Sequence, residues 1–245
     1  MSRISGKLVD LESTKVREFF ERRGESMSEA HPLTSVMYQD DNPRLAEMRD
    51  AFEKQRVVPL LNIGPVAELL DIGCGIGRWA DAFVGRVARY HGVDFSQSLI
   101  RAAERRFSDP SFTFQVLAAQ DVSPATLSVA TPFTHVLISG VLIYLNEADL
   151  AVALQSIVAC CANGALIYVR EPVAIEQRLT LQDHRSEALK SNYSAIYRSE
   201  LELLEIFDRY LISRGFHITL NEQLYPDEMN NRSETTQRIF ILRRE

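Results

Sequence analysis

The sequence is poor in cysteine and in long apolar runs. Its 245 residues contain three cysteines, Cys74, Cys160 and Cys161, whose spacing matches no metal-ligand pattern and whose odd number does not suggest a disulfide framework. No window approaches the roughly 20 apolar residues that span a bilayer, and the N-terminus lacks the apolar stretch of a secretory signal. We therefore expect a cytoplasmic protein that binds no metal and has no membrane partner.

Surplus positive charge is also absent. The formal net charge is -6 and the isoelectric point is near 5.5. Non-specific binding to nucleic acid depends on clustered surplus Lys and Arg, so this balance argues against a nucleic-acid partner. We expect a small-molecule partner instead, bound by a monomer or a homodimer.

Apolar segments alternate between the strand and helix periods along most of the chain. Strands joined by helices at this pace predict parallel strands with crossover connections. Two final strand segments follow one another without an intervening helix, so we expect them to pair as an antiparallel hairpin at the sheet edge. The expected strands are residues 66–73, 90–96, 112–118, 133–140, 165–171, 217–225 and 238–244, and the expected helices include 11–24, 43–61, 78–88, 97–107 and 147–164.

These patterns predict an α/β fold with a Rossmann-like seven-stranded sheet, mostly parallel, that ends in the antiparallel hairpin. We expect residues 1–62 to form an N-terminal helical lid and residues 63–245 to form the ligand-binding domain. The stretch at about 172–198 is longer than a plain crossover. We expect it to be a cap insertion that follows the fifth strand and folds over the mouth of the site.

The segment LLDIGCGIGRWA, residues 69–80, ends a buried strand on Asp71 and continues into Gly73, Gly75 and Gly77. Glycines allow a tight turn and bring the backbone close to a ligand, at the edge where open parallel sheets bind their ligands. Arg78 stands where a dinucleotide-binding loop has its third glycine. A carboxylate beside the loop would repel a pyrophosphate but would favour a ligand that carries positive charge.

Two further acids follow later strands. Asp94 ends the second strand, where a carboxylate can accept hydrogen bonds from both hydroxyls of a ribose. Asp121 follows the third strand and could accept from an adenine amino group, with Val122 against the ring. A solvated strand-end acid that caps the following helix is the alternative for Asp94.

A ribose, an adenine and a cationic centre describe S-adenosylmethionine, and the chain resembles the class I S-adenosylmethionine-dependent methyltransferases. The motifs LLDIGCGIGRWA, GVDFS, AAQDV, FTHVLISGVLIYL and NGALIYVREP carry this resemblance, which covers roughly residues 60–245. It implies a methyltransferase similar to those of bacterial polysaccharide or secondary-metabolite pathways, with S-adenosylhomocysteine as product. The cofactor-binding residues that it implies are Asp71, Gly73, Cys74, Gly75, Gly77, Asp94, Phe95, Gln120, Asp121, Val122 and Ser139.

The acceptor leaves two mechanisms open. An anionic acceptor, such as a phosphate or carboxylate, would need no general base, whereas a sugar or other hydroxyl would need one. Ile143 stands where related small-molecule enzymes place a His, so the base has no obvious position. Our candidates for catalysis are His184, Tyr144 and Glu171, and our candidates for substrate binding are Arg198, Tyr197, Tyr193 and Arg170.

Other functions remain possible at this point. We favour an O-methyltransferase of a small molecule, with an N- or C-methyltransferase and a non-catalytic cofactor-binding module as alternatives. An NAD-dependent oxidoreductase has a similar sheet, but Arg78 and the closing hairpin argue against it. A nucleic-acid methyltransferase is disfavoured because SGVLIYL follows the fourth strand and no basic stripe is present.

Overall fold

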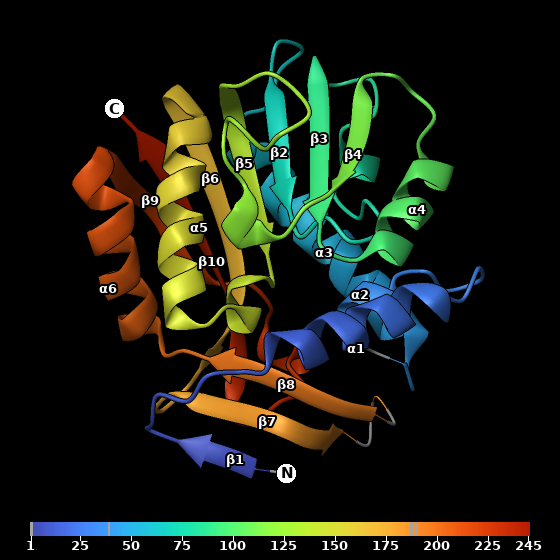
Figure 1. Ribbon diagram of the computed structural model, residues 1–245, viewed down its shortest axis with the longest axis vertical. Coiled ribbons are helices and arrows are strands. Elements are labelled where there is room, and N and C mark those ends of the chain that lie inside the picture. Colours follow the sequence, from blue (N-terminus) through green and yellow to red (C-terminus); the bar gives the residue numbers. More distant parts are fainter. Residues whose placement is uncertain (1, 39, 187–188, 190) are drawn as a thin grey trace.

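The computed structural model describes residues 2–38, 40–186, 189 and 191–245. A seven-stranded sheet in the order β4-β3-β2-β5-β6-β10-β9 forms its centre (Figure 1). The main-sheet strands are β2 (Glu68–Ile72), β3 (Arg89–Asp94), β4 (Phe112–Val116), β5 (Phe133–Ser139), β6 (Cys161–Ala174), β9 (Phe216–Gln223) and β10 (Thr235–Arg244). The helices are α1 (Ser13–Glu25), α2 (Thr34–Met37), α3 (Pro43–Leu61), α4 (Gln97–Arg106), α5 (Glu147–Cys160) and α6 (Glu200–Tyr210).

The strand directions confirm the predicted fold class. Strands β2 to β6 pair in parallel, and β10 runs antiparallel to both of its neighbours, β6 and β9. The strand order reverses between β2 and β5. Ligands bind at such a reversal, beyond the carboxyl ends of the strands, and that end of the sheet lies lowest in Figure 1.

Helices cover both faces of the sheet. In Figure 1, α5 and α6 lie in front, where Leu154 and Phe207 belong to the apolar core against β5, β6 and β10. Helix α3 lies behind, and Val57 and Leu61 pack with Trp79 against the opposite face. The predicted start of α3 is confirmed, because the side chain of Asn42 accepts a hydrogen bond from the backbone N–H of Leu45.

A second, three-stranded sheet lies beyond the carboxyl ends of the main strands. It has the order β1-β7-β8, formed by β1 (Ser2–Ser5), β7 (Leu179–Ser186) and β8 (Ser191–Tyr197). Helix α1 lies between this sheet and the main strand ends (Figure 1). Val16, Phe19 and Phe20 of α1 join the apolar core there, as their spacing predicts.

The N-terminal segment differs from our expectation, whereas the sequence left the secondary structure of the cap open. The segment 1–62 is not purely helical, because residues 2–5 pair with β7, and α3 packs on the main sheet, although its Arg49 lines a cavity. The expected cap at about 172–198 is largely an antiparallel strand pair. Residues 187, 188 and 190 of this stretch lie outside the described residues. β-branched and aromatic residues in LTLQ and NYSAIY account for the strand preference.

The predicted crossover helix at 78–88 is wrong. This stretch contains only the 3-10 helix η1 (Ala80–Ala82) within a series of turns. Gly77 and Gly85 both have positive φ, at 72° and 69°, and leave room for about two helical turns between them. Trp79 and Phe83 stack in parallel and are both buried, so the short turn still covers the sheet.

The loop after β5 is anchored by Arg198, which is 2% exposed. Its Nη1 donates to the carbonyl oxygen of Leu142 and its Nη2 to that of Leu145, each at 2.7 Å, and both Nε and Nη2 reach Glu147. Leu142 begins the 3-10 helix η3 (Leu142–Tyr144). The structure thus gives Arg198 a structural position instead of the substrate contact that we predicted.

Replacing Arg198 with Met should destabilise the fold by about 1 to 3 kcal/mol, because two buried carbonyl groups and Glu147 lose a charged donor. Urea unfolding of the variant measures this loss, with Arg209→Met on the exposed side of α6 as the control. Wild-type stability together with a raised KM for the acceptor would instead restore Arg198 to the substrate site.

Candidate active site

A cavity of about 320 Å³ lies where β2, β3, β4 and β5 end. Such a volume is within the range of small-molecule sites. Eight of the eleven residues that we predicted for the cofactor line it. They are Asp71, Gly73, Cys74, Gly75, Asp94, Phe95, Gln120 and Ser139.

The glycine loop is shaped for close approach of a ligand. Gly73 has φ 70° and Gly75 has φ 55°, conformations that other residues rarely adopt. A Cβ on Gly73 would lie 2.3 Å from Cγ2 of Val141, and one on Gly75 would lie 2.7 Å from Cγ1 of Val36. The bare backbone therefore forms part of the cavity wall, which fits a cofactor that packs against the main chain.

Asp71 and Asp94 supply buried negative charge to this wall. The Tyr90 hydroxyl donates to Asp71, and the backbone N–H groups of Gly75 and Ser96 donate to Asp94 at 3.0 and 2.9 Å. Burial raises the pKa of Asp71 to about 7 and that of Asp94 to about 6 in spite of these bonds. A cationic ligand with hydroxyl groups would favour the ionised form of both side chains.

Three predicted cofactor residues do not line the cavity. The 3-10 helix η2 (Ala119–Asp121) leaves Asp121 exposed, and Val122 is buried in the core under α5. Gln120 lines the cavity from this turn instead. Gly77 serves packing, because a Cβ there would lie 2.7 Å from the ring of Phe107.

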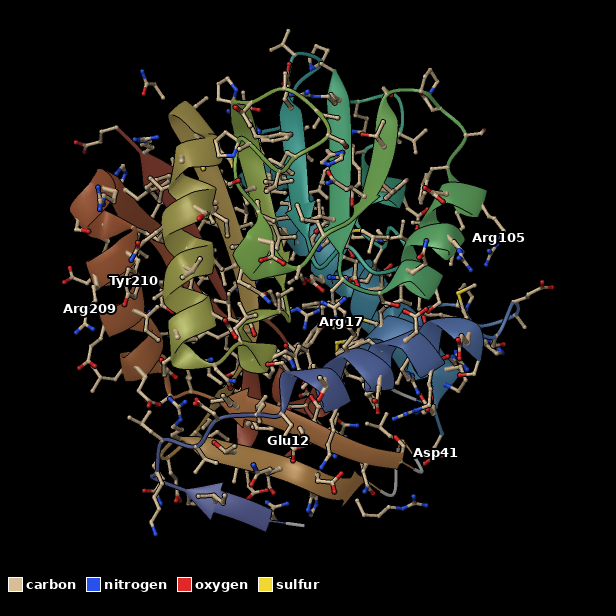
Figure 2. All side chains as sticks on the ribbon, in the orientation of Figure 1. Glu12, Arg17, Asp41, Arg105, Arg209 and Tyr210 are labelled. Atoms are coloured by element: carbon tan, nitrogen blue, oxygen red, sulfur yellow. The ribbon has the colours of Figure 1, made fainter. Side chains whose placement is uncertain are left out.

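Helix α1 closes the cavity with residues that the sequence motifs did not single out. Thr14, Arg17 and Phe20 all line it. Figure 2 shows Arg17 on the side of α1 that faces the main sheet. The guanidinium of Arg17 lies 5.4 Å from the ring centroid of Phe95, which follows β3. The helical spacing of Phe20 was visible in the sequence, but only the fold places it over the glycine loop.

A second cavity, of about 590 Å³, adjoins the first. The two share five lining residues, Val36, Tyr38, Ser139, Gly140 and Arg170. The predicted residues Arg170, His184, Tyr193 and Tyr197 line the second cavity, and Arg198 is not among the described residues that line either one. We expect the cofactor in the first cavity and the acceptor in the second. We call them the donor and acceptor cavities.

The three candidates for catalysis have different surroundings. Both carboxylate oxygens of Glu171 are occupied by the backbone N–H groups of Val141, Leu142 and Ile143, so Glu171 holds the loop after β5 and lies away from the described cavity linings. Burial raises its pKa to about 7. His184 lines the acceptor cavity and is the candidate best placed to reach an acceptor.

Tyr144 belongs to a buried group of hydroxyls between the cavities. It lines the donor cavity and bonds to the hydroxyls of Tyr38 at 3.1 Å and Tyr193 at 2.9 Å. Burial raises the pKa of Tyr144 well above its ordinary value. It therefore stays protonated near neutral pH and can orient a ligand but cannot act as a base.

Sequence reasoning missed a buried ion-pair network under the site. Glu53 of α3 is 0% exposed, and its carboxylate lies 2.9 Å from Nη1 of Arg78 and 3.4 Å from Nε of Arg170. The Tyr168 hydroxyl also donates to it at 2.8 Å. Burial alone would raise the pKa of Glu53, but the charges of Arg78 and Arg170 lower it to about 2.

Arg78 links this network to the glycine loop and to the end of β5. Its Nη1 also bonds to Asp50 at 2.9 Å, and its Nη2 donates to Oγ of Ser139 at 2.8 Å. Arg78 therefore occupies the place of a third glycine because it joins the loop to α3. Acidic residues such as Asp50 and Glu53 are rarely buried on a helix. From the sequence, where their partners are not known, they are therefore interpreted as solvent-exposed.

Comparison with known proteins agrees with this geometry. Residues 69–164 match the methyltransferase domain family, a stretch that runs from the glycine loop to the end of α5. Among curated proteins, none matches the sequence. The chain therefore contains a methyltransferase domain of the S-adenosylmethionine-dependent kind.

Solved structures share the fold at low sequence identity. Phosphoethanolamine N-methyltransferase 1 of Haemonchus contortus, in complex with phosphoethanolamine and S-adenosylhomocysteine, has a TM-score of 0.73 at 15% identity; the match covers 94% of this chain and 48% of that one. Magnesium protoporphyrin IX methyltransferase of Synechocystis, with bound S-adenosylmethionine, gives 0.62 at 15% over 99% and 100% of the chains. The [4+2]-cyclase SpnF gives 0.63 at 16% over 98% and 99%.

Within the described part of the chain, no helix is long and apolar enough to cross a membrane. No group of three or more His, Cys, Asp or Glu side chains in that part could hold a metal ion. The cysteines Cys74, Cys160 and Cys161 are all free and buried.

Replacing Glu53 with Gln should cost about 3 to 5 kcal/mol of unfolding free energy, because Arg78 and Arg170 lose a buried counter-charge. Since its pKa is depressed, the contribution of Glu53 is present above the ordinary carboxyl pKa and is lost as the pH falls toward about 2. Urea unfolding tests this, with the exposed Glu18→Gln as control. A loss below about 1 kcal/mol, the range of a surface pair, would contradict the network's importance.

Affinity for S-adenosylhomocysteine should fall as the pH drops from 8 to 5. The ligand hydroxyls need Asp94 in its ionised form, and one unit below its pKa of about 6 only about a tenth of Asp94 is ionised, so loss of this contact should weaken binding about tenfold. Protonation of Asp71, whose pKa is about 7, should add to the fall. Calorimetry across this range measures the effect. The Asp94→Asn variant should bind weakly and lack the step near pH 6. A flat wild-type profile would argue against Asp94 as a ligand contact.

Proposed function

We propose that this methyltransferase transfers the methyl group to an oxygen of a small anionic acceptor, a carboxylate or phosphate, held in the acceptor cavity. The observation that carries this proposal is the charge of that cavity. Its described lining contains five arginines and one histidine, against a single acidic residue, Glu234. The arginines are Arg3, Arg49, Arg170, Arg185 and Arg232.

The one acidic residue does not neutralise this surplus. Glu234 is exposed at the rim and forms an ion pair with Arg3. A cavity with this surplus attracts anions and concentrates field lines between low-dielectric walls. The chain as a whole is acidic, with a net charge of -6, so the positive lining is a local feature of the site.

The junction of the two cavities defines where the acceptor atom would meet the methyl group. Gly140 at this junction has φ 72°, and a Cβ there would lie 3.2 Å from Nη1 of Arg170. Arg170 thus lies against the end of β5 and lines both cavities. Its guanidinium would hold an acceptor oxygen beside the donor, which is the alignment that methyl transfer requires.

When bound, S-adenosylmethionine supplies a methyl group on a positively charged sulfur. Asp71, Asp94 and the glycine loop would hold it, and Gln120, which lines the same cavity, would reach the adenine. A carboxylate or phosphate oxygen is already ionised near neutral pH, so the protein need only orient it and exclude water. Helix α1 supports this second task, because Val16 and Phe20 close the donor cavity.

Methylation of a hydroxyl is the second candidate function, and His184 favours it. His184 lines the acceptor cavity and could remove the hydroxyl proton, a role that typically adds ~10²- to 10⁴-fold in rate. An N- or C-methyltransferase, a cofactor-binding module without turnover and an NAD-dependent oxidoreductase remain the other outcomes that an assay must separate.

The decisive assay uses S-adenosylmethionine with a labelled methyl group and a panel of carboxylates, phosphate monoesters, sugars and amines. We expect the labelled methyl group in the methyl ester of a carboxylate or of a phosphate, identified by mass spectrometry. Label on nitrogen or carbon would reject the assignment to oxygen. Saturable donor binding without transfer to any acceptor would favour the module, and tight NAD binding without donor binding would favour the oxidoreductase.

The His184→Gln variant separates the two candidate functions. With an anionic acceptor, kcat should stay within about threefold of wild type because no proton leaves the acceptor. A loss of a hundredfold or more, with the KM for the donor unchanged, would show that the acceptor is a hydroxyl and that His184 is its base.

A further inference from the structure

Arg49 is a buried cation at the acceptor cavity. It comes from the second turn of α3 and lines this cavity although its exposed fraction is only 7%. The other arginines that line only this cavity, Arg3, Arg185 and Arg232, are exposed at its rim. Arg49 therefore forms part of the inner wall, and an ion bound there would be largely shielded from water.

The hydrogen bonds of Arg49 leave one side of its guanidinium free. Nε donates to the carbonyl oxygen of Met229 at 3.0 Å, and Nη2 donates to the same oxygen and to Oδ1 of Asn231 at 3.0 Å. Its Nη1 has no acceptor among the described residues, and none of their carboxylates pairs with it. The face of the group also lies 5.3 Å from the ring centroid of Tyr225. These contacts hold the guanidinium of Arg49 in one orientation.

Like charges surround this unpaired cation. Burial lowers the pKa of Arg49, and the positive charges of Arg170 and Arg232 lower it further. The carboxylate of Glu53 pairs with Arg170 and Arg78, and that of Glu234 pairs with Arg3. Arg49, in contrast, donates hydrogen bonds only to uncharged oxygen atoms. A buried charge is costly unless it is paired, so this arrangement favours an anion from outside the chain.

Arg49 and Arg170 have different relations to the donor. Arg170 lines both cavities, whereas Arg49 lines the acceptor cavity alone. An oxyanion on Arg49 would therefore lie away from the residues that the two cavities share. A cavity of about 590 Å³ is also larger than one carboxylate or phosphate requires.

We propose that Arg49 binds a second oxyanion of the acceptor, a carboxylate or phosphate that is not itself methylated, and so selects acceptors with two anionic groups. This inference rests on the proposed function, because it takes the larger cavity as the acceptor site. Arg49 is then a specificity-determining residue, and Arg170 holds the group that receives the methyl. The planar fork suits either oxyanion, since both offer two oxygens in one plane.

The test titrates inorganic phosphate into the full chain saturated with S-adenosylhomocysteine, by calorimetry at constant ionic strength. We expect two phosphate sites in the wild type, one at Arg170 and one at Arg49, and at least tenfold weaker binding at the second site in Arg49→Met. Arg105→Met is the matched control, because Arg105 lies on the outer side of α4 (Figure 2) and its loss changes the net charge equally. This control should bind phosphate as the wild type does.

The Arg49→Lys variant keeps the charge but loses the fork and should weaken phosphate binding at least threefold while leaving affinity for S-adenosylhomocysteine unchanged. If Arg49→Met does not fold, this variant decides the question by the same measurement. Equal phosphate binding in wild type and Arg49→Lys would overturn the proposal. So would a wild type that binds S-adenosylhomocysteine but no phosphate.

Failure of the proposed function gives a different result. A chain that binds no S-adenosylhomocysteine at all overturns the donor assignment before the phosphate titration begins. Once acceptors are known, Arg49→Lys should raise the KM of an acceptor with two anionic groups at least threefold. The KM of an analogue with only one anionic group should stay unchanged. An equal rise for both acceptors would overturn the role of Arg49 in specificity.

Discussion

The site depends on one buried carboxylate, Glu53, and on the cations that it holds. Removing such a charge from water costs several kcal/mol, and only close, well-directed partners offset that cost. Glu53 meets this condition with Arg78, Arg170 and the Tyr168 hydroxyl. Arg78 is thereby fixed against the glycine loop and Ser139, and Arg170 is fixed where the two cavities meet. The same buried ion pairs, on the face of the sheet that α3 covers, thus position residues of both the donor and the acceptor cavity.

Helix α3 supplies more than this foundation. Arg49 and Glu53 are four residues apart, so they lie on the same face of the helix, one turn from each other. Glu53 is directed to the β6 residues Tyr168 and Arg170, whereas Arg49 is directed to the segment between β9 and β10. One rigid element therefore sets the separation between Arg170, where the two cavities meet, and Arg49, which lines the acceptor cavity alone. Loops close over this frame, but they do not determine its spacing.

The sequence predicted the sheet and most of the donor site because both follow from local patterns. Apolar strand segments and the glycine loop each involve residues that are neighbours in the sequence. Of the residues that line the acceptor cavity, the sequence pointed to Arg170, His184, Tyr193 and Tyr197. The other arginines, Arg3, Arg49 and Arg232, come from distant segments that no local pattern joins. Arg198 shows the converse, because a basic residue beside two tyrosines resembled an anion site, yet it pairs with Glu147 across the fold. The helix that we predicted at 78–88 is absent because Gly77 and Gly85 have positive φ, which only the tertiary structure reveals.

The pairing of β1 with β7 has a practical consequence for handling the protein. Because residues 2–5 form the outer strand of the small sheet and Arg3 stands at the rim of the acceptor cavity, additions to the amino end would hang beside the substrate entrance. The carboxyl end lies at the opposite end of the molecule (Figure 1). Affinity tags and immobilisation linkers therefore belong on the carboxyl end, where they leave the entrance clear.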